Sequence, residues 1–254
     1  MAMIGTGLKY AIFAASAVTL MPTGQVQAQQ TSHHVAWSPS YGGSCQACDL
    51  RGRNMSGWDI SNANYPGSDI SGSLLRGTRA VGVVFTGAVG LNADFRQATL
   101  DGAKFMDANL EQSRFDKASL RNADLSRAIM SDVKLRGAFL NGATARRTDF
   151  SNAFARGADF SGANVSNANF SGAKLEGAVF NNTILTGALF AGADLSEAQF
   201  SNIRLSDVDL SVAAGLNTAS FENTCAGSGT VLPDGIELPA CPPLEGTLVL
   251  NFDR

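Results

Sequence analysis

The chain has 254 residues and a formal net charge of -3, and only 16% of its residues are charged, against about a quarter in a typical soluble domain. Glycine is frequent, and there is no basic arm or tail of the kind that binds nucleic acid. Such a composition is typical either of a disordered low-complexity chain or of a repeat protein. Only a repeat places apolar residues at a fixed spacing.

Residues 1–28 have the features of a bacterial export signal. An apolar run at 10–21 follows Lys9, and a small-x-small motif ends at Ala28, where we expect signal peptidase to cleave. The run is too short to cross a bilayer as a helix, although an uncleaved N-terminal anchor is the alternative. We therefore expect a periplasmic or secreted protein with no integral membrane span after cleavage, and a flexible segment at 29–44.

A large apolar residue occupies every fifth position from Leu50 to Leu210, and the phase never slips. The small residues at these positions are Ala80, Gly90, Ala145 and Ala155. Alanine dominates the position two residues earlier, while polar and turn-forming residues fill the rest, as in the segment 158–162 (ADFSG). A period of five fits neither an α-helix nor a flat strand, so the chain is a repeat protein of another kind.

This pattern resembles the A(D/N)LXX motif of the pentapeptide-repeat family. The resemblance implies an all-β fold, a right-handed quadrilateral β-helix over residues 45–212, in which four pentapeptides form one coil. Coils would stack as parallel strands about 4.8 Å apart, giving a solenoid about 40 Å long. Large side chains would fill the axis, and alanine would let the corners close around them.

Residues twenty apart should share one face of such a solenoid. The first half then stacks one pair of phenylalanine columns and the second half another pair, a quarter turn away. The predicted columns are Phe85 with Phe105, Phe95 with Phe115, Phe150 with Phe170 and Phe190, and Phe160 with Phe180 and Phe200. We expect a change of packing near Ala145, either with a bend or, if phenylalanine and leucine exchange freely at the axis, without one.

The five-residue pattern ends at Leu210, and residues 213–254 are predicted to form a short helical and loop cap. The stretch from 215 to 242 resembles the terminal cap of secreted family members, in which a helix plugs the axis. We expect a short helix at 216–224, with Leu216 and Phe221 facing the last coil, and an edge strand at 248–252. Such a cap would cover strand edges that otherwise invite aggregation.

Four cysteines lie outside the repeats or at their start, and an exported protein tends to oxidise them to disulfides. A disulfide needs Cα atoms within about 7 Å, far less than the expected length of the solenoid. The pairs that can form within one chain are therefore Cys45–Cys48 and Cys225–Cys241.

The Cys45-x-x-Cys48 motif also has a second interpretation. Redox proteins and zinc sites share this spacing, and His33 and His34 would complete a set of two cysteines and two histidines. The βαβ context of a redox motif is missing, so we favour a structural disulfide, with metal binding, redox activity and free thiols as the alternatives.

The sequence predicts no enzyme, no cofactor and no metal site, since no acid, base and nucleophile can be assembled on the solenoid. One face should carry a basic stripe, and Phe139 and Phe154 should point outward near the change of packing expected at Ala145. The cations predicted for this candidate interaction surface are Arg76, Arg96, Arg114, Lys134, Arg136 and Arg156, with Lys117 and Lys174 beside them. The alternative for the stripe is that its charges are only solvated and bind no partner. The alternative for the two phenylalanines is that they pack against each other or against a loop.

These features predict a non-catalytic, exported scaffold of the cell envelope, monomeric or homodimeric. Its partner would be a protein or an anionic envelope polymer rather than nucleic acid. The alternative comes from the family resemblance, because some cytoplasmic members mimic duplex DNA and bind type II topoisomerases, which gives quinolone resistance. The export signal and the basic stripe argue against that alternative.

Overall fold

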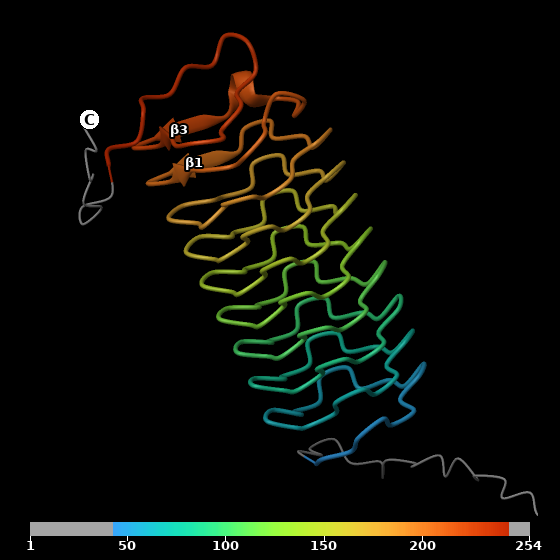
Figure 1. Cartoon of the computed structure of the whole chain (residues 1–254). Helices are drawn as coiled ribbons and strands as arrows, with labels where there is room; N and C mark the ends of the chain where they lie inside the picture. Colours follow the sequence, from blue (N-terminus) through green and yellow to red (C-terminus); the bar gives the residue numbers. More distant parts are fainter. Residues whose placement is uncertain (1–42, 244–254) are drawn as a thin grey trace, which may run out of the picture. The chain divides into compact units, whose positions relative to one another are not determined.

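The computed structural model describes residues 43–243 of the chain. In this part the backbone winds into coils that stack one on another, as Figure 1 shows. We call the stack of residues 44–214 the rod. The expected export signal, most of the segment at 29–44 and the expected edge strand at 248–252 lie outside the described residues.

The coils are joined by a parallel ladder with a constant register of twenty residues. It begins with the bridge between Ser44 and Asn64 and continues on all four faces to the bridge between Asp194 and Ala214. The structure is thus a right-handed quadrilateral β-helix, as the sequence predicts. Each coil needs four tight turns, and the second turn residue takes a left-handed conformation that suits glycine or asparagine. At Gly187 a Cβ atom would lie 2.5 Å from Oδ1 of Asn167, one coil below.

The axis is filled by the large residue of each pentapeptide, and none of these side chains is more than 4% exposed. The alanines two positions earlier are buried as well. Rings twenty residues apart stack face to face, for example Phe95 on Phe115 with centroids 4.7 Å apart. Rings ten residues apart meet edge to face across the axis, as Phe160 and Phe170 do at 5.7 Å. Both geometries are favourable for aromatic pairs.

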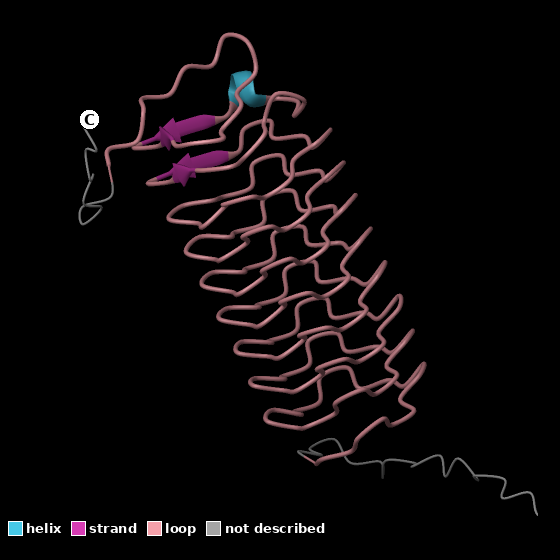
Figure 2. Cartoon of the chain, in the orientation of Figure 1, coloured by secondary structure: helices cyan, strands magenta, loops and turns pink. Residues whose placement is uncertain are grey.

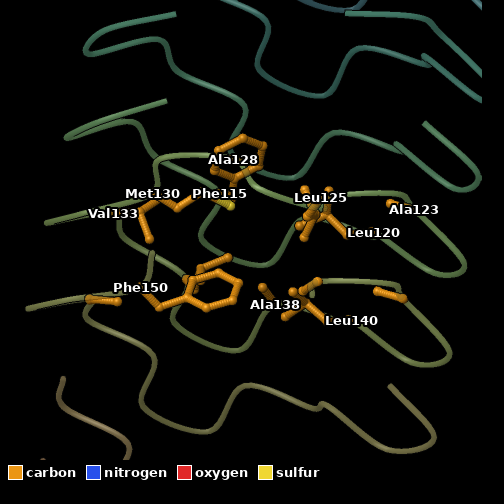
Figure 3. Packing of buried hydrophobic residues seen from close by; sticks show 14 of the residues in the cluster. Phe115, Leu120, Ala123, Leu125, Ala128, Met130, Val133, Ala138, Leu140 and Phe150 are labelled. Carbon is orange, nitrogen blue, oxygen red and sulfur yellow. The ribbon is translucent and has the colours of Figure 1, made fainter. Parts of the chain in front are cut away.

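The phenylalanine columns change faces between Phe115 and Phe150, through a layer of leucine and methionine. Figure 3 shows side chains of this layer, Leu120, Leu125, Met130 and Leu140, which point into the axis. Phe115 and Phe150 lie on either side of the layer. The bridges on either side of Ala145 keep the register of twenty, and the coils in Figure 1 continue in one even stack. Within the described residues the packing therefore changes without a bend, because exchanging axial side chains leaves the backbone hydrogen bonds unaltered.

Gly90 is the one axial position without a side chain. A Cβ atom placed there would lie 2.9 Å from Cδ2 of Leu110 and 3.1 Å from Cγ1 of Ile70. These two neighbours, one coil above and one below, have therefore taken the space that a side chain would use.

The cap continues the coils with irregular spacing, and Figure 2 shows its short helix in cyan near strands drawn in magenta. Strand β1 (Gln199–Ser201) pairs in parallel with β3 (Ser220–Glu222), and β2 (Arg204–Leu205) pairs with β4 (Cys225–Ala226). A 3-10 helix, η1 (Leu216–Thr218), precedes β3.

The helix predicted for 216–224 is therefore wrong beyond its first turn. Leu216 is buried at the end of the axis, and Phe221 stacks on Phe200 with centroids 5.1 Å apart. Both residues thus face the last coil, as predicted. The chain after η1 is extended because pairing with β1 satisfies its backbone groups and continues an aromatic column, which a helix could not do.

Candidate interaction surface

Two disulfides stabilise the ends of the described chain. Cys45 is bonded to Cys48 with Cα atoms 5.8 Å apart, and Cys225 to Cys241 with Cα atoms 4.9 Å apart. These are the pairs predicted from the sequence. In this structure the Cys45-x-x-Cys48 motif holds a disulfide, and the histidines of the alternative zinc set lie outside the described residues.

The predicted basic stripe follows one face of the rod and the corner after it. Successive bridges join Asp94 to Arg114, Arg114 to Lys134, Lys134 to Phe154 and Phe154 to Lys174, so these five residues form one column. The turn residues two positions after each column residue form a second column at the corner. We call the two columns, together with Lys117, which follows Asp116 at the corner, the basic face.

The first coils of the basic face neutralise their own charge. Asp94, whose side chain is only 8% exposed, forms an ion pair with Arg96. Burial acts to raise the pKa of Asp94, but hydrogen bonds from the side chain and backbone of Arg96 outweigh it and hold the pKa below its usual value. In the next coil Nε of Arg114 lies 3.8 Å from Oδ2 of Asp116. In this pair the cation precedes the acid in the sequence, whereas in the pair of Asp94 and Arg96 the acid comes first. Arg114 therefore lies over Asp94 in a square of alternating charge.

The last coils of the basic face are also compensated. Arg156 forms an ion pair of 2.9 Å with Glu176. Lys174 is the backbone-ladder neighbour of Asp194, which places an acid beside it without a direct ion pair. The pKa of Asp194 is lowered mainly by the hydrogen bonds from Ser196, and the charge of Lys174 adds to the effect.

The cations between these two ends remain unpaired. Within the described residues, Lys117, Lys134 and Arg136 form no ion pair with an acid. Lys117 and Arg136 belong to consecutive turns, joined by a hydrogen bond of 2.9 Å from Lys117 N–H to the Arg136 carbonyl. Arg76 at the start of the stripe and Lys174 near its end form no ion pair in the described residues either, so Lys117, Lys134 and Arg136 are the unpaired cations at its centre, in two neighbouring coils.

Both predicted outward phenylalanines are exposed, Phe139 by 40% and Phe154 by 37%. Phe154 stands in the column of Lys134, whereas Phe139 stands between Ser119 and Asp159 in the column of the next face. They therefore lie on either side of the corner that carries Arg136, rather than stacked on each other. The guanidinium of Arg121 covers Phe139 at 4.7 Å from the ring centre, a cation–π contact.

A comparison with protein-family profiles bears on the origin of this arrangement. The profile of pentapeptide repeats matches in eight copies, over residues 68–105, 103–142, 140–177 and 173–211. The chain belongs to the pentapeptide-repeat family. The matched residues cover most of the rod, including the whole of the basic face.

Solved pentapeptide-repeat structures resemble the chain to varying degrees. HetL from the cyanobacterium Nostoc sp. strain PCC 7120, which is involved in heterocyst differentiation regulation, is 25% identical over 76% of this chain and 90% of its own, with a TM-score of 0.41. QnrB1, a plasmid-mediated fluoroquinolone resistance protein, is 22% identical over 62% and 90%, with a TM-score of 0.37. A protein of the Arabidopsis thaliana thylakoid lumen is 33% identical over 48% and 68%, with a TM-score of 0.21. The curated proteins gave no match.

The aspartates of the pentapeptide repeats serve mainly in turns. Asp209 accepts hydrogen bonds from the side chain and the backbone N–H of Ser211, which lower its pKa. In Asp159 burial acts to raise the pKa, but hydrogen bonds from Ser161 and Asn141 outweigh it. These carboxylates stand in rows on separate coils, and no group of three or more potential metal ligands occurs in residues 43–243. Nor is any helix in this range long and apolar enough to cross a membrane.

A hollow lies outside the pentapeptide coils, between η1 and the cap loop. Its apolar lining includes Leu216, Phe221, Ile236 and Leu238, and its acids are Asp234 and Glu237. The hollow contains none of the residues predicted for the interaction surface.

The stripe is predictable from the sequence, but the ion pairs between its own acids and cations were not predicted. The order Asp94-x-Arg96 followed twenty residues later by Arg114-x-Asp116 is visible in the sequence and signals alternating charge once the register is known. No sequence pattern indicates the contact of Arg121 with Phe139, because it depends on how the flexible arginine side chain extends from its own corner to the ring in the next coil.

Proposed function

We propose that this pentapeptide-repeat protein is a non-catalytic, exported scaffold of the cell envelope that binds a macromolecular partner on its outer faces. The observation that carries the proposal is the filled axis, since large side chains occupy the interior from Leu50 to Leu210. A ligand can therefore reach the rod only from outside. A rigid solenoid with long outer faces suits contact with an extended partner.

Two features support export. The first 28 residues have the pattern of a cleavable signal, and the cysteines form two disulfides, which persist in oxidising compartments and are rare in the cytosol. The disulfides close the start of the rod and the cap, where a solenoid is most exposed to unravelling.

Cell fractionation in a bacterial host tests the proposal. We expect the chain in the periplasm or the medium, with an N-terminus at Gln29 by mass spectrometry and all four cysteines resistant to alkylation until reduction. The matched control is a variant lacking residues 2–28, which should remain in the cytoplasm with reactive thiols. An uncleaved, cytoplasmic full-length chain would contradict the proposal and favour the DNA-mimic alternative, for which inhibition of a type II topoisomerase is the assay.

A further inference from the structure

We propose that one corner of the rod is a docking site for an acidic protein segment that also carries apolar side chains. We call it the Lys–Arg corner, and it consists of Lys117, Lys134 and Arg136 with Phe154 on one side and Phe139 on the other. The inference deepens the proposed scaffold function and rests on it, because it assigns both the surface and the chemistry of the partner.

Charge is the first reason for choosing this corner. The acids of the basic face form ion pairs with Arg96, Arg114 and Arg156, and none of them forms an ion pair with the three central cations. Parallel neighbours in a sheet lie about 4.8 Å apart. Three positive charges within two coils therefore attract anions to one place on a chain whose net charge is negative.

The second reason is the aromatic exposure beside the cations. Phe154 lies between Lys134 and Lys174 in its column, and Phe139 lies on the adjoining face. Neither ring is needed at the axis, which is filled without them. Aromatic residues and arginine are enriched in the centres of protein interfaces, where they contribute most of the binding free energy.

The combination favours a protein segment over a hydrated anionic polymer. A polymer that offers only charge would leave the exposed parts of both phenyl rings in water and would gain nothing from them. A protein segment could contact the cations of the corner through its carboxylates and the phenyl ring on each adjoining face through an apolar side chain. Because the two rings are on adjoining faces, such a segment has to cross the corner.

Fluorescence anisotropy with labelled peptides tests the docking site on the mature chain, residues 29–254. One probe alternates glutamate and phenylalanine, a second of equal charge contains glutamate and serine, and a third ligand is polyphosphate. We expect the glutamate–phenylalanine peptide to bind about tenfold more tightly than the glutamate–serine peptide, since the rings contribute to its affinity. Phe154→Ser should remove most of that difference.

Charge reversals at two corners provide the matched comparison. Lys117→Glu/Arg136→Glu should weaken binding of the glutamate–phenylalanine peptide at least about tenfold, since close charge pairs across an interface couple by this much or more. Arg146→Glu/Arg147→Glu makes the same change of charge on a different corner and should leave affinity within about twofold, because distant charges are screened. Circular dichroism should show the same fold and unfolding midpoint for both variants.

Three outcomes would overturn the docking site. Equal loss in both double variants would indicate attraction to net charge alone. Equal binding of polyphosphate and both peptides, insensitive to Phe154→Ser, would indicate a general polyanion surface. Absence of peptide binding by the unmutated chain would also exclude the site as described. None of these results affects the location, processing or thiol state of the protein, so the export test is judged separately.

Discussion

Replacing Phe170 with alanine is expected to lower the free energy of unfolding by about 3–5 kcal/mol. The ring is fully buried and stacks between Phe150 and Phe190, with centroids 5.1 and 5.2 Å away. It also meets the edges of Phe160 and Phe180 across the axis. Rigid coils above and below cannot collapse into the space, so the cavity persists. Urea denaturation followed by circular dichroism measures the loss.

Phe154→Ala is the matched control, with the same substitution at an outward position. Because Phe154 is 37% exposed and belongs to no axial column, the change should alter the free energy of unfolding by less than about 0.5 kcal/mol. Similar losses in the two variants would mean that axial packing is not what stabilises the rod.

Gly90→Leu is expected to destabilise the rod by about 1–3 kcal/mol, although it restores the consensus residue of the repeat. The Cβ atom alone would lie within 3.1 Å of both Leu110 and Ile70. The remaining carbons of leucine would have to displace these side chains from the axis or force them into unfavourable rotamers.

Gly90→Leu/Leu110→Ala tests this explanation by moving the side chain from one coil to the next. The double variant should recover most of the stability lost by Gly90→Leu, and the two changes should be strongly non-additive, as expected for neighbours that share one space. Thermal and urea unfolding of the full cycle gives the coupling. If Gly90→Leu stabilises the protein, or if the two effects simply add, the proposed overlap is wrong.

The period of five was sufficient to predict the coil because it constrains inward-facing residues. Leu50 and Leu210 mark a single unbroken phase, and rows twenty residues apart predict stacks such as Phe150 on Phe170 before any coordinates are known. The same rule correctly assigned Arg136 and Phe154 to the outer surface. Where the period ends, prediction weakened. Residues 219–224 look helical locally, but Ser220–Glu222 form strand β3, because pairing with β1 outweighs helix propensity.

Contacts among outward side chains were the least predictable feature. The position of Arg156 follows from the register, but its ion pair with Glu176 depends on the rotamers of two long side chains. The cation–π contact of Arg121 is of the same kind. Of the two outcomes predicted near Ala145, the change of packing without a bend is the one observed, since hydrogen bonds between coils are made by the backbone and do not depend on the exchange of leucine and phenylalanine.

The packing that stabilises the rod is separate from the outer faces that are available for binding. Each coil contacts only its neighbours, so stability is close to a sum over coils and interfaces. Residues of the Lys–Arg corner point away from every such interface. Sequence changes at Lys117 or Arg136 can therefore alter binding without altering the fold, which leaves the outer faces free to specialise.

Amide hydrogen exchange measured residue by residue tests the stacked coil most directly, because four of the five N–H groups in a typical pentapeptide are bonded in the backbone ladder and turns. The fifth, just after the axial residue, is bonded only where a preceding side chain accepts it, as Asp124 does for Ser126 at 3.0 Å. Among the described residues many of these N–H groups have no such acceptor, including those of Thr86, Leu91, Met106, Ser131, Arg136 and Arg156. We predict slow exchange throughout the rod, interrupted in phase with the repeat by fast exchange at the amides that lack such an acceptor. Slow exchange with no five-residue period, or fast exchange at axial amides such as Phe105 and Leu135, would contradict the coil and everything built on it.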